Sequence, residues 1–577
     1  MRSLSTLQFL RPKACWKPLV GSSNARTIAK PIPACSRYIH LARQQELEQA
    51  NALKYPRLQH NAAAPSMRIP EFRAKYDYIP KDTVVEEEVT IRGRLESVRR
   101  VGSKLVFLDI KGEFEHLQGL CNLGKLVDGT AVSDFKNLAR LLNRGDIISV
   151  TGKPTRSSTG ELSIQATCIP QLLTPSLVPQ PFKVEETVHR QIDMLVNRQT
   201  TDTLRLRSHI IRYLRDFFHE RDFLEFQTPI LAGAAGGAVA RPFTMTSEAI
   251  KKDVSLRIAP ELWLKRLVVG GVDRVFELGP AFRNEGIDQT HNPEFTICEF
   301  YHAYANLEDL IALTETLFRG AARHCSSLIE TKLTSLPPID LSQFDGPFPR
   351  AEFIPTLESK LGFSLPDLSD LEAYHSLLSS LKSRSIELEE PIPQTLPKLL
   401  DRLASLYIEP LSLPSPSSST SSGSRPLFIT HHPVCMSPLS KSFLCPKTKQ
   451  LVSARTELFV GGRELANMYE EENDPFSQRQ KLVEQLRSRE LDGEKEGDPR
   501  VDESYVFALG SGLPPTGGWG CGVERLVMLL AGTRRISDVL SFGNLRNVVA
   551  HSSGGVVEYR VGEGEGENER GEEEKEE

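Results

Sequence analysis

The largest group of side chains able to do chemistry lies in residues 274–304, RVFELGPAFRNEGIDQTHNPEFTICEFYHAY. Two strand-like runs flank a polar loop there, as in a long hairpin. Strand alternation places four side chains of the second run on one face: Phe295, Ile297, Glu299 and Tyr301. The loop and its base carry Glu285, His291 and Arg283, whose rigid fork of donors can bind a phosphate. A phenylalanine nearby can stack on a flat heterocycle, so the segment indicates a nucleotide site; the alternative is a surface hairpin with solvated charges.

A second group lies in RTELFVGGRELANMYEEEND, residues 455–474. Gly461 and Gly462 can form a tight two-residue hairpin turn, which places Glu457 and Glu464 on the same face of the strand pair. Two close carboxylates repel each other unless a cation lies between them, and Mg²⁺ takes carboxylate and phosphate oxygens together. The pattern predicts a magnesium site; the alternative is two exposed glutamates on a sheet edge.

A glycine-rich turn, GLPPTGGWGCGVERLVMLLAG at residues 512–532, leads into a helix whose first residues include Glu524 and Arg525. Glycines let a backbone approach a ligand closely. The glycine spacing is not that of a dinucleotide-binding loop, and the chain contains no G-x-x-x-x-G-K-[ST] sequence. A Rossmann or P-loop nucleotide site is therefore not indicated.

Several elements must position these groups. Leu206, Ile210, Leu214 and Phe217 recur at three- and four-residue spacing, which predicts an amphipathic helix over 203–220, followed by a strand with Pro229 near its end. Residues 84–178 contain about five short β-rich runs, which predict a small barrel; a five-stranded OB barrel is one solution. The region from about 335 to 425, which includes a Ser/Pro-rich loop at 412–425, is interpreted as an inserted or peripheral subdomain.

The two ends of the chain differ in charge. The first 45 of the 577 residues contain no Asp or Glu but several Arg and Lys, a composition typical of a mitochondrial transit peptide. The alternative is a basic arm that binds RNA. The sequence EGEGENERGEEEKEE predicts a solvated acidic tail. The net charge of −5 argues against unspecific nucleic-acid binding over the whole surface, no apolar run predicts a membrane span, and nine scattered cysteines without a CxxC pair argue against a zinc site.

In this order, the helix and strand ending at Pro229, the FRNE…HNPEF segment and GWGCGVERL resemble motifs 1, 2 and 3 of class II aminoacyl-tRNA synthetases. Within that class, RIAPELWLKRLVVGG and ELFVGGRELAN are most similar to the lysyl-tRNA synthetases. Aspartyl and asparaginyl enzymes usually carry FRDE and S-P-Q where this chain has Asn284 and Glu261, and a cationic substrate needs buried carboxylates.

The resemblance implies an α+β protein: an N-terminal OB-fold β-barrel followed by the class II antiparallel β-sheet flanked by helices. The expected parts are a transit peptide and disordered leader (1–65), an anticodon-binding barrel (66–182), a catalytic domain (183–556) and an acidic disordered tail (557–577). It further implies a ligase of the mitochondrial matrix that joins L-lysine to tRNA(Lys) with ATP and Mg²⁺, acting as a homodimer with motif 1 at the two-fold interface.

The resemblance also implies the roles of individual residues. Arg283 and Arg525 are the expected catalytic residues. The residues expected to bind ATP are Arg283, Glu285, His291, Phe295 and Arg525, with the adenine between Phe295 and Arg525. The residues expected to bind lysine are Gly237, Glu261, Glu299, Tyr301, Asn467 and Glu471, with Glu471 and Tyr301 at the ε-ammonium. Glu457 and Glu464 are the expected Mg²⁺ ligands.

In the barrel, the residues expected to contact the anticodon are Arg92, Arg94, Phe107 and Gln118. Two positions depart from the family pattern: Leu105 stands where bacterial relatives place a base-stacking phenylalanine, and Met468 stands where smaller residues are usual, which would narrow the pocket. Three other hypotheses remain at this point. They are an aspartyl or asparaginyl enzyme, a non-catalytic RNA-binding factor of the same fold, and an enzyme that lysylates a protein.

Overall fold

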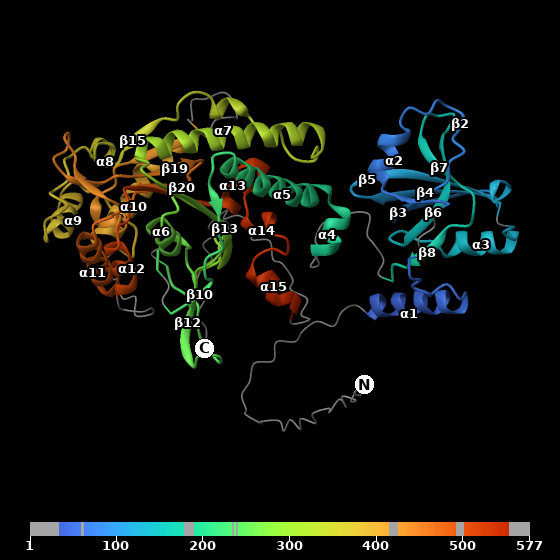
Figure 1. Cartoon of the computed structure of the whole chain (residues 1–577), viewed down its shortest axis with the longest axis horizontal. Coiled ribbons are helices and arrows are strands. Elements are labelled where there is room, and N and C mark those ends of the chain that lie inside the picture. The colour runs from blue at the N-terminus through green and yellow to red at the C-terminus, as the bar shows by residue number, and fades with distance from the viewer. Residues whose placement is uncertain are drawn as a thin grey trace, which may run out of the picture. The chain divides into compact units, whose positions relative to one another are not determined.

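The computed structural model describes residues 34–58, 63–127, 129–177, 190–233, 236–237, 240–414, 425–491 and 501–552. The chain forms two compact units, Met1–Pro181 and Phe182–Glu577 (Figure 1). No helix in the described part of the chain is long and apolar enough to cross a membrane. Residues 1–33 of the predicted transit peptide and the acidic tail at 557–577 lie outside the described residues.

The first unit is a closed barrel, which confirms the predicted small β domain. Its strands are β1 (Ser66–Met67), β2 (Thr83–Val84), β3 (Val89–Val101), β4 (Leu105–Gly112), β5 (Glu115–Asn122), β6 (Ile147–Arg156), β7 (Leu162–Ala166) and β8 (Gln171–Thr174). The order β3-β4-β5-β7-β6 closes through a β3–β6 pairing. Alternate side chains such as Ile91, Leu108 and Ile148 fill the interior. The unit also contains α2 (Ile69–Tyr76) and α3 (Val132–Leu141).

Helix α1 (Ala34–Gln49) corrects the expectation that the disordered leader extends to residue 65. Leu47 is fully buried in the barrel core, and Arg43 forms a buried ion pair with Asp146 at 3.1 Å. Arg43 and Asp146 lie 103 residues apart, so local composition cannot reveal the contact that anchors this helix. The ordered barrel unit therefore begins well before residue 66.

An eight-stranded sheet forms the centre of the second unit, in the order β15-β16-β19-β20-β21-β14-β13-β9. Its strands are β9 (Leu224–Glu225), β13 (Arg274–Phe282), β14 (Glu294–Ala303), β15 (Arg350–Glu352), β16 (Leu427–Thr430), β19 (Arg455–Val460), β20 (Arg463–Glu470) and β21 (Thr516–Gly522). The central strands are antiparallel, and the edge strands β9 and β15 pair in parallel, which confirms the predicted α+β class. Smaller strands outside this sheet are β10 (Leu231–Ala232), β11 (Thr244–Ser247), β12 (Lys252–Leu256), β17 (Ser442–Leu444) and β18 (Leu451–Ser453).

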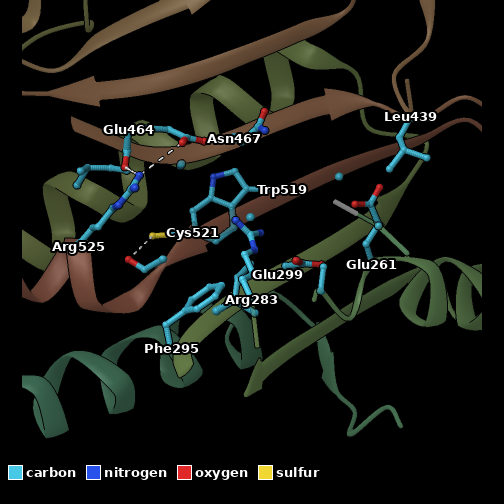
Figure 2. Close-up of a pocket in the computed structure, with 18 of the residues that line it drawn as sticks. Glu261, Arg283, Phe295, Glu299, Leu439, Glu464, Asn467, Trp519, Cys521 and Arg525 are labelled. Carbon is cyan, nitrogen blue, oxygen red and sulfur yellow. Dashed lines mark hydrogen bonds and ion pairs between the residues drawn. The ribbon is translucent and has the colours of Figure 1, made fainter. Parts of the chain in front are cut away.

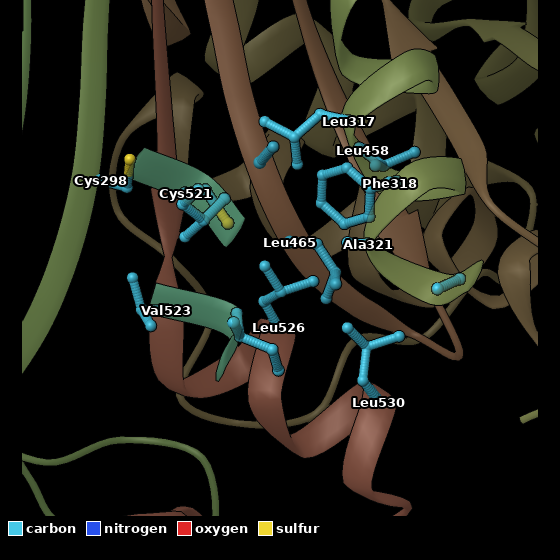
Figure 3. Packing of buried hydrophobic residues seen from close by; sticks show 14 of the residues in the cluster. Cys298, Leu317, Phe318, Ala321, Leu458, Leu465, Cys521, Val523, Leu526 and Leu530 are labelled. Atoms are coloured by element: carbon cyan, nitrogen blue, oxygen red, sulfur yellow. The ribbon is translucent and has the colours of Figure 1, made fainter. Parts of the chain in front are cut away.

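One face of this sheet packs against α5 (Arg198–His219), α7 (Leu307–Thr331) and α13 (Val523–Ala531). Figure 3 shows Phe318 of α7 and Leu526 of α13 among strand residues such as Leu465. The predicted stripe of α5 is buried in this core: Leu206, Ile210, Leu214 and Phe217. Because apolar side chains fill this face, the polar residues that alternate with them point to the opposite face.

The remaining helices of the second unit are α4 (Arg190–Val196), α6 (Glu261–Val269), α8 (Phe353–Leu361), α9 (Ala373–Ser383), α10 (Leu396–Tyr407), α11 (Pro475–Leu491), α12 (Glu503–Gly510), α14 (Ile536–Val539) and α15 (Leu545–Ser552). Helices α8, α9 and α10 fall within the predicted insertion at 335–425 and share an apolar core that includes Leu357, Leu377 and Leu400. Ile429 of β16 and Phe459 of β19 belong to the same core, so this part of the insertion packs on the edge of the central sheet.

Candidate functional site

A cavity of about 430 Å³ lies on the sheet face opposite the main core. Ten of the eleven residues predicted to bind ATP or lysine line it: Gly237, Glu261, Arg283, Glu285, His291, Phe295, Glu299, Tyr301, Asn467 and Arg525. In Figure 2, Arg525 and Glu464 lie at one end, Glu261 lies at the other, and Arg283 and Glu299 lie between them. We call the part around Glu261 and Glu299 the amino-acid end.

Strand β14 supplies the floor of the cavity. Phe295, Ile297, Glu299 and Tyr301 all line it, as the alternation of the strand predicts. The intervening Cys298 and Phe300 point into the apolar core instead. The same alternation corrects the expectation for Met468 on β20: Asn467 lines the cavity, but Met468 is fully buried in the core behind the sheet and does not narrow the pocket.

Glu299 is a buried carboxylate that forms no ion pair with the described residues, although the charge of Arg283 opposes the rise in its pKa. Its side chain is only 5% exposed, and the Tyr301 hydroxyl donates a hydrogen bond to Glu299 Oε2 at 3.2 Å. Burial raises the pKa of Glu299 to about 8, and the nearby carboxylate of Glu261 adds to the rise. A cation entering the cavity would stabilise the ionised form, so this position favours a positively charged group.

The eleventh predicted residue, Glu471, is near the amino-acid end but is not among the residues that line the cavity. Its carboxylate forms an ion pair with the ammonium of Lys265, a fully buried residue of α6. Lys265 Nζ also donates to Glu261 Oε1 at 2.6 Å, and the Tyr469 hydroxyl donates to that same oxygen at 2.7 Å. Glu471 was predicted to bind the ε-ammonium of lysine; in the structure its carboxylate is paired with an ammonium of the chain itself.

Gly518 of β21 lies against the side chains of Glu471 and Tyr301, and the lack of a side chain at Gly518 leaves room for both. A Cβ at this position would lie 2.7 Å from Tyr301 Cε1 and closer still to Glu471 Oε1. We expect Gly518→Ala to weaken the use of the amino-acid substrate at least tenfold and to lower the free energy of unfolding by roughly 1–3 kcal/mol, the usual cost of overpacking. The matched control is Gly510→Ala, where a Cβ would meet nothing within 4 Å. Thermal melts and steady-state kinetics of both variants check this, and an equal effect of the two would contradict it.

At the centre of the cavity, Arg283 presents an unused donor. Its guanidinium carbon lies 5.1 Å from the centroid of the Phe295 ring, and its buried Nε has no hydrogen-bond partner among the described residues. A buried donor without a partner is costly, and an anion would satisfy it. Arg283 is therefore placed to bind a negatively charged group such as a phosphate.

Arg525, at the far end, is held by two contacts. It donates to the backbone oxygen of Glu464 at 2.9 Å and lies 2.9 Å from His291 Nε2. On its other side, His291 Nδ1 lies 2.8 Å from Asp288 Oδ2. Three segments that are distant in the chain, the β13–β14 loop, β20 and α13, are joined by these contacts at the end of the cavity.

The two carboxylates predicted to bind Mg²⁺ come from the β19–β20 hairpin. Gly461 and Gly462 have φ values of 62° and 71°, as the predicted two-residue hairpin turn requires. Glu464 lines the cavity with 39% of its side chain exposed, whereas Glu457 does not line it. The carboxylate of Glu457 is bonded to Arg455 and to His432 Nε2, the latter at 3.1 Å.

The electrostatics of this carboxylate pair fit a divalent cation. Burial raises the pKa of Glu464, and the charge of Glu457 raises it further. Burial also raises the pKa of Glu409, to about 7, with contributions from Asp401, Glu457 and Glu464. Within the described residues no group of three or more His, Cys, Asp or Glu is arranged to hold a metal. The carboxylates can thus supply part of an oxygen shell whose remaining ligands come from elsewhere, such as phosphate oxygens.

Sequence reasoning missed several residues of this site. Lys265 stands in the quoted RIAPELWLKRLVVGG segment, four residues after Glu261, a spacing that places both on one face of a helix. Arg455 donates to Asn467 Oδ1 at 3.0 Å as well as holding Glu457. Asp401 and Glu409 belong to the predicted insertion at 335–425, and no local signal in the sequence links them to the hairpin.

In the barrel, the four predicted anticodon residues are all half-buried and lie outside the interior core. Gln118 of β5 is opposite Asp109 of β4, two residues from Phe107. One face of the Phe107 ring is covered by Arg99, whose guanidinium carbon lies 4.5 Å from the ring centroid. Arg92 and Arg94 lie on the neighbouring β3, so the four side chains share the outer surface of three adjacent strands.

Comparisons with known proteins cover both units. Residues 184–546 match the family described as tRNA synthetases class II (D, K and N), and residues 89–172 match the family described as OB-fold nucleic acid binding domain. The chain is 41% identical to the mitochondrial lysine–tRNA ligase of Schizosaccharomyces pombe, over 88% of this chain and 93% of the relative. It is 37% identical to a probable cytoplasmic lysine–tRNA ligase of Encephalitozoon cuniculi, over 80% of this chain and 88% of the relative. It is also 37% identical to the lysine–tRNA ligase of Helicobacter hepaticus, over 81% and 85%.

Proposed function

The chain belongs to the class II aminoacyl-tRNA synthetases, in the family of the lysine–tRNA ligases, and from this premise we propose that its cavity activates L-lysine with ATP for transfer to tRNA(Lys) in mitochondria. The substrates of such an enzyme are ATP, lysine and tRNA. The observation that carries the choice of lysine is Glu299. It is a buried carboxylate that lines the cavity and forms no ion pair with the described residues, and its raised pKa reflects a position that an ammonium would stabilise.

The proposed first step joins lysine to the α-phosphate of ATP. A carboxylate oxygen of lysine attacks the α-phosphorus, and the bond to pyrophosphate breaks. Arg283 lines the cavity between its two ends, which supports a role for this residue at the α-phosphate, where it would stabilise the charge that builds up in the transition state. Arg525, which is bonded to His291 and Glu464, would hold the nucleotide at the far end of the cavity.

In the second step, a ribose hydroxyl of the tRNA attacks the carbonyl of the lysyl group, and AMP leaves. No side chain forms a covalent bond with the substrate. The protein positions the two reactants and stabilises charge, and these two effects together can supply a large share of the rate enhancement.

We propose that Glu464 and Glu457 hold Mg²⁺ against the phosphates of ATP. The raised pKa of Glu464 supports this, because the unbalanced negative charge at the hairpin favours a cation. The ion would supply electrostatic stabilisation to the phosphates. Because Glu457 is already bonded to Arg455 and His432, the more exposed Glu464 is the better direct ligand.

Amino-acid-dependent pyrophosphate exchange tests the proposed substrate. We expect L-lysine to support exchange of labelled pyrophosphate into ATP, and L-aspartate and L-asparagine to support none. Exchange with aspartate or asparagine, and not with lysine, would establish the alternative amino-acid specificity within the class. Absence of exchange with all three would contradict an active synthetase.

The raised pKa of Glu299 predicts how lysine binding depends on pH. With a pKa of about 8, only about a tenth of Glu299 is ionised at pH 7, and lysine binds the ionised form. The affinity must therefore rise as the pH rises toward 8. We expect the dissociation constant of lysine to fall roughly eightfold between pH 6.5 and 7.5, with a proton released on binding.

Isothermal titration calorimetry in two buffers that differ in ionisation enthalpy measures both the affinity and the released proton. The affinity for ATP, measured in the same way, serves as the control, because Glu299 lies away from the far end of the cavity. A dissociation constant for lysine that does not change over this pH range would contradict the prediction.

We propose that the outer surface of β3, β4 and β5 binds the anticodon of tRNA(Lys), supported by the grouping of Arg92, Arg94, Phe107 and Gln118 there.

We also propose a homodimer through the motif 1 segment, supported by the exposed apolar side chains of Leu224, Ile230 and Leu231. Footprinting of the tRNA and sedimentation of the purified protein test these two proposals.

The mitochondrial address rests on the acid-free leader and on the mitochondrial forms among the relatives. A reporter fused to residues 1–60 should enter mitochondria. A purely cytosolic signal would contradict the proposed mitochondrial location, but it would not bear on the proposed activity.

A further inference from the structure

Lys265 is a charged side chain at the amino-acid end that the proposed reaction does not use. It lies on α6, one turn after Glu261, and is fully buried. Its ammonium contacts Glu261 Oε1 at 2.6 Å and the carboxylate of Glu471. It also lies near the rings of three tyrosines, with distances to their centroids of 5.8, 5.7 and 5.8 Å for Tyr301, Tyr469 and Tyr505.

Stability alone does not explain this arrangement. A buried ion pair often contributes no more than apolar residues of similar volume, because the removal of water from the charges offsets their attraction. The apolar residues Leu262, Leu264 and Val268 show that α6 otherwise packs by ordinary hydrophobic contact. An internal lysine bonded to two carboxylates beside a binding cavity is therefore better explained by the charge of that cavity.

The charges at the amino-acid end can be counted. Glu261, Glu299 and Glu471 are all at most 5% exposed and would carry three negative charges when ionised. Lys265 supplies one positive charge and leaves two negative charges for a ligand. Lysine carries two ammonium groups, and its carboxylate can face Arg283, which lines the same cavity. With lysine bound, the three carboxylates would face three ammonium groups.

We infer that Lys265 is the internal counter-cation of the amino-acid end: it neutralises Glu471, positions Glu261, and so leaves a charge that matches a substrate with two ammonium groups. This inference rests on the proposed function and adds a residue that acts through its neighbours. Lys265 is a positioning residue, because it does not line the cavity. It contributes to amino-acid specificity because it sets how many carboxylates of the amino-acid end remain unpaired for the substrate.

The groups that face Lys265 come from four elements. The titratable and charged side chains around it are Glu261 on α6, Glu299 and Tyr301 on β14, Tyr469 on β20, Glu471 directly after β20, and Tyr505 on α12. Burial lowers the pKa of Lys265, but Glu261 and Glu471 outweigh it and raise the pKa well above that of a free lysine. Burial raises the pKa values of Tyr301, Tyr469 and Tyr505, which therefore stay neutral. The ammonium of Lys265 is thus permanently charged.

A double-mutant cycle tests the charge count, with lysine-dependent pyrophosphate exchange as the readout. Lys265→Met leaves three carboxylates for the two ammonium groups of lysine. Glu471→Gln leaves two carboxylates for three ammonium groups, those of Lys265 and of the substrate. We expect each single variant to lose at least tenfold in kcat/KM for lysine. In the double variant Lys265→Met/Glu471→Gln the two negative charges are restored, so we expect it to be at least tenfold more active than Glu471→Gln alone.

The comparison of the double variant with Glu471→Gln does not depend on whether Lys265→Met folds. A double variant no more active than Glu471→Gln would overturn the inference, because a merely structural lysine, or a Glu471 that binds the substrate directly, predicts that the losses add. Lys360→Met, at an exposed position on α8, is the matched control and should change nothing. Absence of lysine-dependent exchange in the unmodified protein would contradict the proposed function itself, whereas an active protein with additive losses would contradict only the role of Lys265.

Discussion

Arg283→Ala is expected to lower kcat for lysine-dependent pyrophosphate exchange roughly 10²–10³-fold, the usual loss when one preorganised donor to a developing charge is removed. Arg283 lines the cavity, and its Nε has no hydrogen-bond partner among the described residues, so the guanidinium can turn toward the α-phosphate without breaking a hydrogen bond at that nitrogen. Because the charge on the phosphate grows in the transition state, the loss should fall mainly on kcat. Single-turnover formation of lysyl-adenylate measures the step directly.

Two controls separate this role from a general effect of losing an arginine. Arg283→Lys keeps the charge but not the planar fork, and should recover only part of the rate. Arg274→Ala removes an arginine from the start of β13, the strand that Arg283 follows; its side chain contacts His302 and Asp222, and its loss should leave exchange nearly unchanged. An Arg283→Ala variant that keeps its kcat would show that the phosphate role is misassigned.

Glu299→Gln is expected to weaken lysine use by roughly 2–4 kcal/mol, or about 30- to 1,000-fold in kcat/KM, because an amide cannot balance a buried ammonium. Glutamine keeps the volume of the side chain and an oxygen that can accept the hydrogen bond from Tyr301. The loss should therefore reflect charge rather than packing. The KM for ATP should change little, since Glu299 lies away from Arg525 in the cavity.

The same variant should lose the pH dependence of lysine binding, because that dependence is assigned to the raised pKa of Glu299. Glu294→Gln, an exposed position at the start of the same strand, is the matched control. Equal losses for lysine and ATP in Glu299→Gln, or a pH dependence that persists in it, would count against the assignment.

Local patterns in the sequence were enough to predict much of the site. The alternation along β14 correctly placed Phe295, Glu299 and Tyr301 on one face, because a strand presents every second side chain to the same side. The glycine pair of the β19–β20 hairpin predicted its turn for an equally local reason, since positive φ at two successive residues favours glycine. The spacing of apolar residues predicted the buried stripe of α5.

Contacts between distant segments were not predicted. Glu471 was predicted to bind the ε-ammonium of lysine, and its pairing with Lys265 of α6 was not foreseen. Glu457 was predicted to bind Mg²⁺, and its contacts with Arg455 and His432 were not foreseen. Residue types alone could not show these partners, because whether a carboxylate is free or paired depends on which side chains the fold brings within about 3 Å of it.

The sequence by itself determined the class of protein, the two units and the residues that face the cavity, because motifs and periodicity are properties of neighbouring residues. Only the tertiary structure decided the boundary at α1, the burial of Met468 behind the sheet and the charge of the amino-acid end. These depend on packing between elements that are far apart in the chain. The pKa of Glu299 is such a property, since burial by several segments and the neighbouring Glu261 raise it to about 8.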